Sequence, residues 1–130
     1  MRYLIVLALL LTASAAAGAG CDVSCLVEKG LKGDGDAALY VARESKTTQS
    51  KEIVNEWYRI AAENGNVDGQ FEFANLLFSE ARSGHDCIRA VYWYQQAERN
   101  GHPDAKTSLL RAQAALANDA ASAGPCSDGR

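Results

Sequence analysis

Four cysteines carry the most distinctive chemistry in this sequence: Cys21, Cys25, Cys87 and Cys126. They form no C-x-x-C pair, which is the spacing of thiol oxidoreductases, of haem attachment and of most structural zinc sites. The two histidines, His85 and His102, are too scattered to complete a set of zinc ligands. We therefore expect disulfide bonds, with three possible connectivities, and neither a bound metal nor a cofactor.

Catalytic motifs are also missing from the sequence. No serine is followed three residues later by lysine, and the G-x-S-x-G, H-E-x-x-H and phosphate-loop patterns do not occur. The histidines fall at predicted loop or cap positions, where exposed helix-end residues are commoner than general bases. Glu63 beside Arg59 and Glu98 beside Arg99 are expected to be solvated surface charges. We predict that the protein is not an enzyme; an acid pair for glycan cleavage is an alternative that depends on the distance between carboxylates.

The composition indicates one small helical domain. The chain has 130 residues, 48% of them hydrophobic, with only two prolines and no alternating Val/Ile/Thr run, which favours an all-α fold. Its 13 basic and 16 acidic side chains give a net charge of −3. This charge provides no basic field to hold nucleic acid or an anionic membrane surface.

Residues 1–20 have the pattern of a signal peptide. Arg2 is followed by an apolar run over 3–11 and then by small residues that offer A-x-A cleavage sites. The apolar run is shorter than a membrane span, which argues against a retained anchor, so we predict a periplasmic or secreted mature chain. In the alternative, Cys21 carries lipid as in outer-membrane lipoproteins, although Gly18 stands where that signal has an apolar residue. Membrane contact is expected only in that case.

The sequence contains an internal repeat at an offset of 36 residues. Six of twelve positions are identical between 57–68 and 93–104, a similarity typical of stacked helical hairpins. The identities pair Trp57, Tyr58, Ala61, Asn64, Gly65 and Asp68 with Trp93, Tyr94, Ala97, Asn100, Gly101 and Asp104. A weaker copy at an offset of 32 matches Gly33, Asp36 and Ala42 to Gly65, Asp68 and Ala74.

Each repeat is expected to contain two helices. The helices that carry the Trp-Tyr pair, which we call B-type, end at Asn-Gly, where Gly65 and Gly101 are expected to adopt the left-handed conformation. The helix after each glycine is A-type, with Asn66 or His102 in its capping region. The expected ranges are a short helix near 22–31, then A-type 35–45, B-type 50–64, A-type 67–82, B-type 87–100 and A-type 103–119.

The motifs W-Y-R-I-A-A-E-N-G at 57–65 and W-Y-Q-Q-A-E-R-N-G at 93–101 resemble the Sel-one-like repeat, a family related to tetratricopeptide repeats. The motif residues are Trp57, Tyr58, Ala61, Gly65, Trp93, Tyr94, Ala97 and Gly101. The resemblance covers about 33–118. It implies a short α-solenoid of about three antiparallel hairpins, spanning 21–119 with an N-terminal capping helix and followed by a tail over 120–130.

The motif residues are expected to build the core. Trp57 and Trp93 place a large side chain beside the small Ala61 and Ala97, so that neighbouring helices interlock. Gly69 stands where the family usually has a packing alanine. The A-type helices are expected to contribute Leu39, Phe73, Leu76, Leu77, Leu109 and Leu110.

The stacked arrangement also predicts the disulfide pairing. The start of the B-type helix that holds Cys87 lies at the same end of the stack as the exit of the last A-type helix, so the tail brings Cys126 back to it. We expect a Cys87–Cys126 bond. Cys21 and Cys25 are then left to pair with each other, which requires a local departure from ideal helix geometry.

The resemblance implies protein–protein recognition along the surface lined by A-type helices. We predict an adaptor or scaffold in a bacterial cell envelope, with another protein as its partner. The candidate contact residues are Gln70, Glu72, Asn75, Lys106 and Arg111. Alternatives are a cell-wall-directed or β-lactam-interacting enzyme and an inhibitor or immunity-type binding protein. Pairing into a homodimer would cover the exposed end faces of so short an array.

Overall fold

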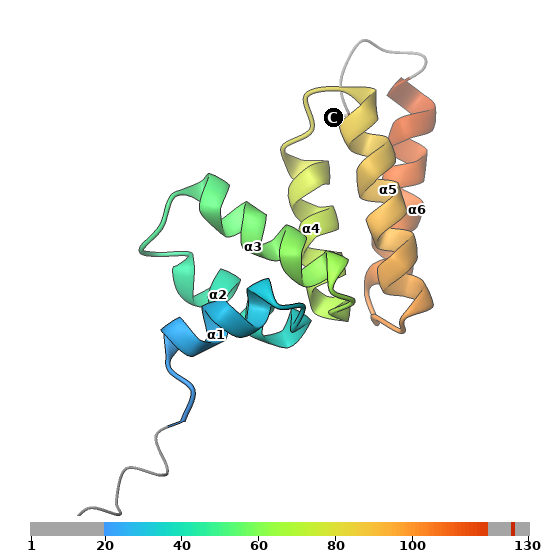
Figure 1. Cartoon of the computed structure of the whole chain (residues 1–130). Coiled ribbons are helices and arrows are strands. Elements are labelled where there is room, and N and C mark those ends of the chain that lie inside the picture. Colours follow the sequence, from blue (N-terminus) through green and yellow to red (C-terminus); the bar gives the residue numbers. More distant parts are fainter. Residues whose placement is uncertain (1–19, 120–125, 127–130) are drawn as a thin grey trace, which may run out of the picture.

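The computed structural model of the chain describes residues 20–119 and Cys126, and all regular structure in this part is helical (Figure 1). Six helices follow one another: α1 (Val23–Leu31), α2 (Gly35–Ser45), α3 (Lys51–Glu63), α4 (Val67–Ser79), α5 (Gly84–Arg99) and α6 (Ala105–Asp119). None of these helices is long and apolar enough to cross a membrane. The all-α prediction is confirmed. The predicted signal segment and C-terminal tail lie outside the described residues, apart from Gly20 and Cys126.

The expected boundaries hold to within one residue for α1, α2 and α3, but not for the connection between α4 and α5. The expected end of α4 was 82 and the expected start of α5 was 87, whereas α4 ends at Ser79 and α5 begins at Gly84. The Asp86 carboxylate accepts hydrogen bonds from the Arg82 amide (3.0 Å) and the Ser83 hydroxyl (3.3 Å). These bonds hold the chain at the start of α5, so the helix forms one turn earlier than its hydrophobic pattern indicates.

Three glycines end helices in the same way. Gly33, Gly65 and Gly101 follow α1, α3 and α5 with φ values of +106°, +81° and +88°. This left-handed region strains any residue that has a Cβ, so the prediction for Gly65 and Gly101 is confirmed. The side chains of Asp34 and Asn66 then cap α2 and α4. Helix α1 therefore ends at a left-handed glycine, as the two B-type helices do.

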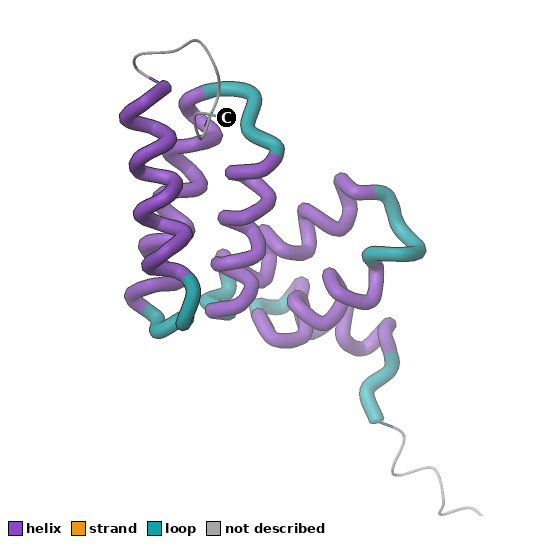
Figure 2. The backbone as a smooth tube through the Cα atoms, turned by 180° about the vertical axis from the view of Figure 1, so that it is seen from behind, coloured by secondary structure: helices purple, strands orange, loops and turns teal. Residues whose placement is uncertain are grey.

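Each helix packs against the helices before and after it in the chain, and short loops turn it back antiparallel to its neighbour (Figures 1 and 2). Alternate helices also meet, because α1 touches α3 and α2 touches α4. The guanidinium of Arg111 on α6 lies 5.1 Å from the ring centre of Phe78 on α4. Helix α4 therefore contacts both of the other A-type helices, α2 and α6.

Two tyrosines, and not the two tryptophans, form the centre of the core. Tyr58 and Tyr94 are only 2% and 0% exposed, whereas Trp57 and Trp93 pack half-buried against the core clusters. The prediction that these motif residues build the core is confirmed, and the tyrosine of each motif lies deeper because it stands about 100° further around the helix and points most directly inward. The small motif residues Ala61 and Ala97 are fully buried, as expected.

The A-type helices supply most of the expected apolar side chains. Leu39, Phe73 and Leu109 are buried, and Leu76 and Leu77 are half-buried against the core. The exception is Leu110, which is 58% exposed. Its inclusion in the core was wrong because the preceding leucine already occupies the inward-facing position.

Helices α3 and α4 approach closely at Gly69. A methyl group built on Gly69 would lie 2.7 Å from the Cβ of Ala61 and 3.1 Å from its carbonyl carbon. One repeat later the equivalent position is Ala105, which is fully buried. Gly69 therefore allows α3 and α4 to lie closer together than an alanine would.

Both expected cysteine pairs are disulfide-bonded. Cys87, in the first turn of α5, joins Cys126 with a Cα–Cα distance of 5.6 Å. Cys21 joins Cys25 with a Cα–Cα distance of 5.3 Å. Both distances fall in the usual disulfide range. The longer link ties Cys126 to the start of α5.

Candidate functional site

Four of the five predicted contact residues lie at or near the surface of the A-type helices. Glu72 and Asn75 on α4 are half-buried, and Lys106 and Arg111 on α6 are exposed. Arg111 covers the ring of Phe78, so its charged group also serves to join α6 to α4.

The fifth predicted contact residue, Gln70, lies inside the molecule. It is 5% exposed, its amide donates to the carbonyl of Ala62 (3.4 Å), and its carbonyl accepts from the amide of Asn100 (2.8 Å). The side chain therefore links α4 to the ends of α3 and α5. We assign Gln70 to packing, because its polar groups are already occupied within the protein.

A hollow of about 460 Å³ opens between the loop after α2, the first half of α3, and α4. Glu72 is the one predicted contact residue that lines it. The other lining residues were not predicted to be functional: Lys46, Gln49, Lys51, Val54, Asn55, Tyr58 and Leu76. Two ammonium groups, one phenol and two amides face a single carboxylate, so the lining has an excess of hydrogen-bond donors.

The hydroxyl of Tyr58 is buried at this hollow without a hydrogen-bond partner among the described residues. The equivalent tyrosine one repeat later, Tyr94, donates to Asn75 Oδ1 at 2.7 Å. At the offset of 32 residues, the position of Asn75 is occupied by Arg43 in α2. Arg43 points elsewhere, with Nη2 3.2 Å from Asp68 Oδ2. The α2–α3 pair thus lacks an acceptor equivalent to Asn75, which accepts the hydrogen bond of the tyrosine in the α4–α5 pair.

Lys46 lies next to the phenol of Tyr58. Its Nζ is 5.4 Å from the ring centre and forms no ion pair with any described carboxylate. Attraction to the Tyr58 hydroxyl, aided by the charge of Glu72, raises the pKa of Lys46 above its ordinary value despite partial burial and the charge of Arg43. The ammonium group is therefore positively charged at neutral pH and is attracted to the Tyr58 hydroxyl.

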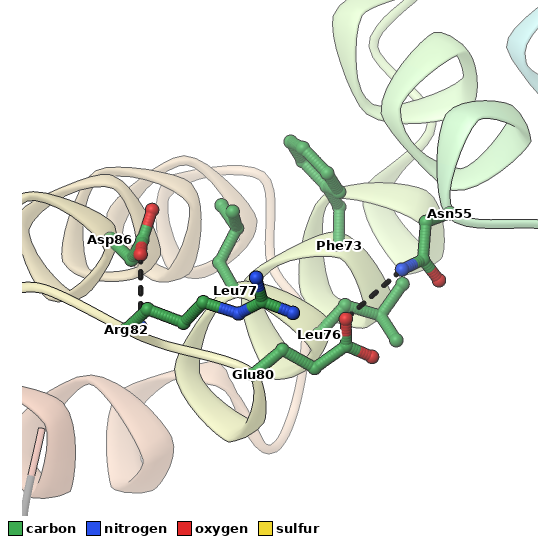
Figure 3. Close-up of a pocket in the computed structure, with 7 residues that line it drawn as sticks. All are labelled: Asn55, Phe73, Leu76, Leu77, Glu80, Arg82 and Asp86. Carbon is green, nitrogen blue, oxygen red and sulfur yellow. Dashed lines mark hydrogen bonds between the residues drawn. The ribbon is translucent and has the colours of Figure 1, made fainter. Parts of the chain in front are cut away.

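A second hollow, of about 260 Å³, adjoins the first and shares Asn55 and Leu76 with it. Figure 3 shows the side chain of Arg82 extending into this space toward Leu76. The carboxylate of Glu80 lines the second hollow, where it accepts from Asn55 Nδ2 (3.2 Å) and pairs with Lys51 Nζ (2.8 Å) of the first. Together the hollows form a surface that crosses the α3–α4 contact.

The two histidines occupy different environments. His85 is exposed in the first turn of α5, as expected. The side chain of His102 is only 10% exposed and stacks on the ring of Phe71 with a centroid distance of 3.9 Å, so the expectation that it is exposed was wrong. Its Nδ1 accepts from the amide of Asp104 (3.2 Å). This turn delays the start of α6 to Ala105, compared with the expected 103.

Most of the hollow was missed because its residues have ordinary structural roles in the sequence. Tyr58 was assigned to the core, and Lys46 and Gln49 lie in a connection without a motif. One signal was present, since the comparison of repeats places Arg43 where the second hairpin has Asn75. That difference removes the hydrogen-bond acceptor for one of two otherwise equivalent tyrosines.

In comparisons with known proteins, no family model, no curated protein and no solved structure matches the chain. The resemblance to Sel-one-like repeats therefore depends on the motif residues themselves and on the positions they occupy.

Proposed function

We propose that this chain is an exported adaptor that binds a segment of another protein at the two adjoining hollows. We further propose that its helices form a short α-solenoid of the Sel-one-like type. Two features support the repeat assignment: the left-handed glycines Gly33, Gly65 and Gly101 that end alternate helices, and the equivalent burial of Tyr58 and Tyr94.

Export is supported by the cysteine chemistry. All four cysteines in the chain pair as disulfides, which persist in oxidising compartments such as the periplasm or the extracellular space. The pattern of residues 1–20 agrees with this location. Because Cys21 is paired with Cys25, the disulfide form leaves no thiol for lipid attachment at Cys21.

The observation that carries the adaptor proposal is the pair of hollows on either side of Asn55 and Leu76. The first is rich in polar donors, and the second combines the apolar side chains of Phe73, Leu76 and Leu77 with the charged side chains of Glu80, Arg82 and Asp86. A peptide segment that carries both polar and apolar side chains matches these two hollows. The hollows lie on the same connected surface, so one extended segment reaches both.

Site-specific photo-crosslinking in the native envelope tests this proposal. A photoreactive amino acid replaces Gln49 at the rim of the first hollow in one variant and Arg82 in the second hollow in another. A matched control carries it at Tyr92, which is 51% exposed on the outer side of α5. We expect one protein of the same mass to crosslink at both hollow positions and not at the control. Equal labelling at all three positions, or no protein adduct at either hollow, would contradict the adaptor function.

A further inference from the structure

Helix α6 is an A-type helix that no B-type helix follows within the described residues. The helices run in the order B-type α1, then the A–B pairs α2–α3 and α4–α5, then A-type α6. In both pairs the A-type helix packs against the B-type helix that comes after it. In a stack of helical hairpins each unit buries its apolar face against its neighbours, so α6 is left with one face uncovered.

The α4–α5 pair shows which positions of an A-type helix a B-type helix covers. Phe71 and Phe78 of α4 lie beside the ring of Tyr94 on α5, with centroid distances of 5.8 Å and 6.5 Å. Ala74 belongs to the same buried cluster as Tyr94. It is 0% exposed, as is Ala42, the equivalent residue of α2. The covered positions are therefore spaced as Phe71, Ala74 and Phe78, along one face of the helix.

The same three positions are exposed on α6. At the offset of 36 residues they are occupied by Thr107, Leu110 and Ala114. Leu110 is 58% exposed, whereas its equivalents Ala42 and Ala74 are fully buried. We call the surface formed by Thr107, Leu110 and Ala114 the open face of α6. It corresponds to the surface of α4 that α5 covers, and no described helix lies on it.

Two basic side chains, Lys106 and Arg111, stand on either side of Leu110 on the helix surface. Both are exposed, and neither forms an ion pair with a described carboxylate. They are the only charged residues of α6 before Asp119 at its end. An apolar strip between two cations is complementary to an apolar strip that has acidic residues beside it.

We propose that the open face of α6 binds an amphipathic helix of a partner protein, with an apolar side chain on Leu110 and acidic side chains beside Lys106 and Arg111. The bound helix takes the place of the missing B-type helix, so the contact continues the one that α4 makes with α5. This inference goes beyond the proposed function, because none of the residues that line the two hollows belongs to α6. A protein with both sites holds two segments at once.

A second copy of the chain is a poorer occupant of the open face. It offers α1, which has the glycine ending of a B-type helix and which no described A-type helix precedes. At the offset of 32 residues, however, α1 has Lys29 where α3 has the buried Ala61. In an antiparallel pair the end of the B-type helix lies beside the start of the A-type helix, so Lys29 would lie near Lys106. Repulsion between these like charges disfavours self-association through the open face.

Nuclear magnetic resonance titration of the full oxidised protein with designed helical peptides tests the proposal. The probe is a peptide of about 18 residues, long enough to form a helix, with leucine and alanine along one face and glutamate on both sides of that face. Its match has lysine in place of each glutamate. We expect the glutamate peptide to shift the signals of Thr107, Leu110 and Ala114 in a saturable way, and the lysine peptide to bind about tenfold more weakly. Equal binding of the two peptides, shifts confined to other helices, or no binding of either peptide would overturn the proposal.

Two substitutions separate the apolar contact from the charges. Leu110→Asp is expected to weaken binding of the glutamate peptide about tenfold, because it puts a carboxylate into the apolar contact. The matched control is Ile88→Asp on α5, which alters a side chain of similar exposure (56%) and is expected to leave binding unchanged. Lys106→Glu is expected to reduce the preference for the glutamate peptide over the lysine peptide about threefold to fivefold. Equal losses in the two aspartate variants, or an unchanged preference in Lys106→Glu, would contradict the assignment.

Sedimentation of the protein alone over a range of concentrations tests the choice of occupant. We expect a monomer. A dimer that Leu110→Asp dissociates and Ile88→Asp does not would show that a second copy covers the open face, and would overturn the assignment to a partner helix. These outcomes are independent of crosslinking at Gln49 and Arg82, so the site on α6 and the proposed function at the hollows fail separately.

Discussion

Replacing each core tyrosine by phenylalanine is expected to change stability in opposite directions. Tyr58 and Tyr94 occupy equivalent positions in consecutive repeats and are equally buried. Tyr94 donates its proton to Asn75 Oδ1 at 2.7 Å, whereas the hydroxyl of Tyr58 is buried without a partner among the described residues. The same chemical change therefore removes a hydrogen bond in one variant and removes an unsatisfied polar group in the other.

The size of the difference follows from the contacts. Tyr94→Phe loses one hydrogen bond and leaves the carbonyl of half-buried Asn75 without its partner, a loss of about 1–2 kcal/mol in the free energy of unfolding. Tyr58→Phe relieves the desolvation of the buried hydroxyl but also loses its attraction to the Lys46 ammonium, so the gain is at most about 1 kcal/mol. The two variants should thus differ by about 1–3 kcal/mol.

Urea unfolding of the oxidised protein at neutral pH, followed by circular dichroism, measures both free energies by linear extrapolation. For about 100 ordered residues, 1 kcal/mol corresponds to a shift of about 4–8 °C in Tm, so thermal melts provide an independent check. A loss of stability in Tyr58→Phe as large as that in Tyr94→Phe would refute the reasoning, because the Tyr58 hydroxyl would then have a partner in solution.

Three further predictions concern packing, the long disulfide and pH. Gly69→Ala places a methyl group 2.7 Å from the Cβ of Ala61. Although alanine has the higher helix propensity, we expect this contact to lower the free energy of unfolding by about 1–2 kcal/mol in a urea melt. No loss of stability would show that α3 and α4 separate freely. Replacing both Cys87 and Cys126 by serine opens a loop with a sequence separation of 39, and we expect the free energy of unfolding in urea to fall by about 4 kcal/mol. A loss below about 1 kcal/mol would contradict the role of this bond as the main covalent restraint. Burial raises the pKa of Tyr94 from 10.0 to about 12, so its contribution to stability is complete below pH 10 and declines as the pH rises toward 12. In melts at alkaline pH, the stability of the unmodified protein should fall more steeply with pH than that of Tyr94→Phe. Equal falls in the two proteins would contradict this prediction.

The sequence was sufficient to predict the features that depend on local chemistry and on periodicity. The repeat of the Trp-Tyr motif located four helices, and the Asn-Gly pairs located the ends of two of them at Gly65 and Gly101. The direction of successive helices then placed Cys87 near Cys126. Each of these inferences needs only the helical period, the conformational preference of glycine, or the reversal of direction at a short loop.

Features that depend on the exact rotation of a helix were harder to predict. Trp57 and Tyr58 are adjacent and both apolar enough to pack inward, so the sequence alone could not decide which ring takes the centre of the core. Gln70 has the composition of a surface residue but is buried, because Asn100 and the Ala62 carbonyl satisfy its amide. The hollow is lined by the loop after α2, by α3 and by α4, so it depends on how three segments meet and not on any single residue.

The two disulfides restrain the C-terminal end of the molecule more than its N-terminal end. The Cys87–Cys126 bond encloses most of α5 and all of α6 within one covalent ring. The Cys21–Cys25 bond joins cysteines with a sequence separation of only 4 and leaves α1 joined to α2 by noncovalent packing and the main chain. Local opening consequently costs least at the N-terminal end and most at the C-terminal end. Helix α3, which carries Tyr58, lies between them, so transient release of α1 and α2 would widen the space beside it while the C-terminal helices stay closed.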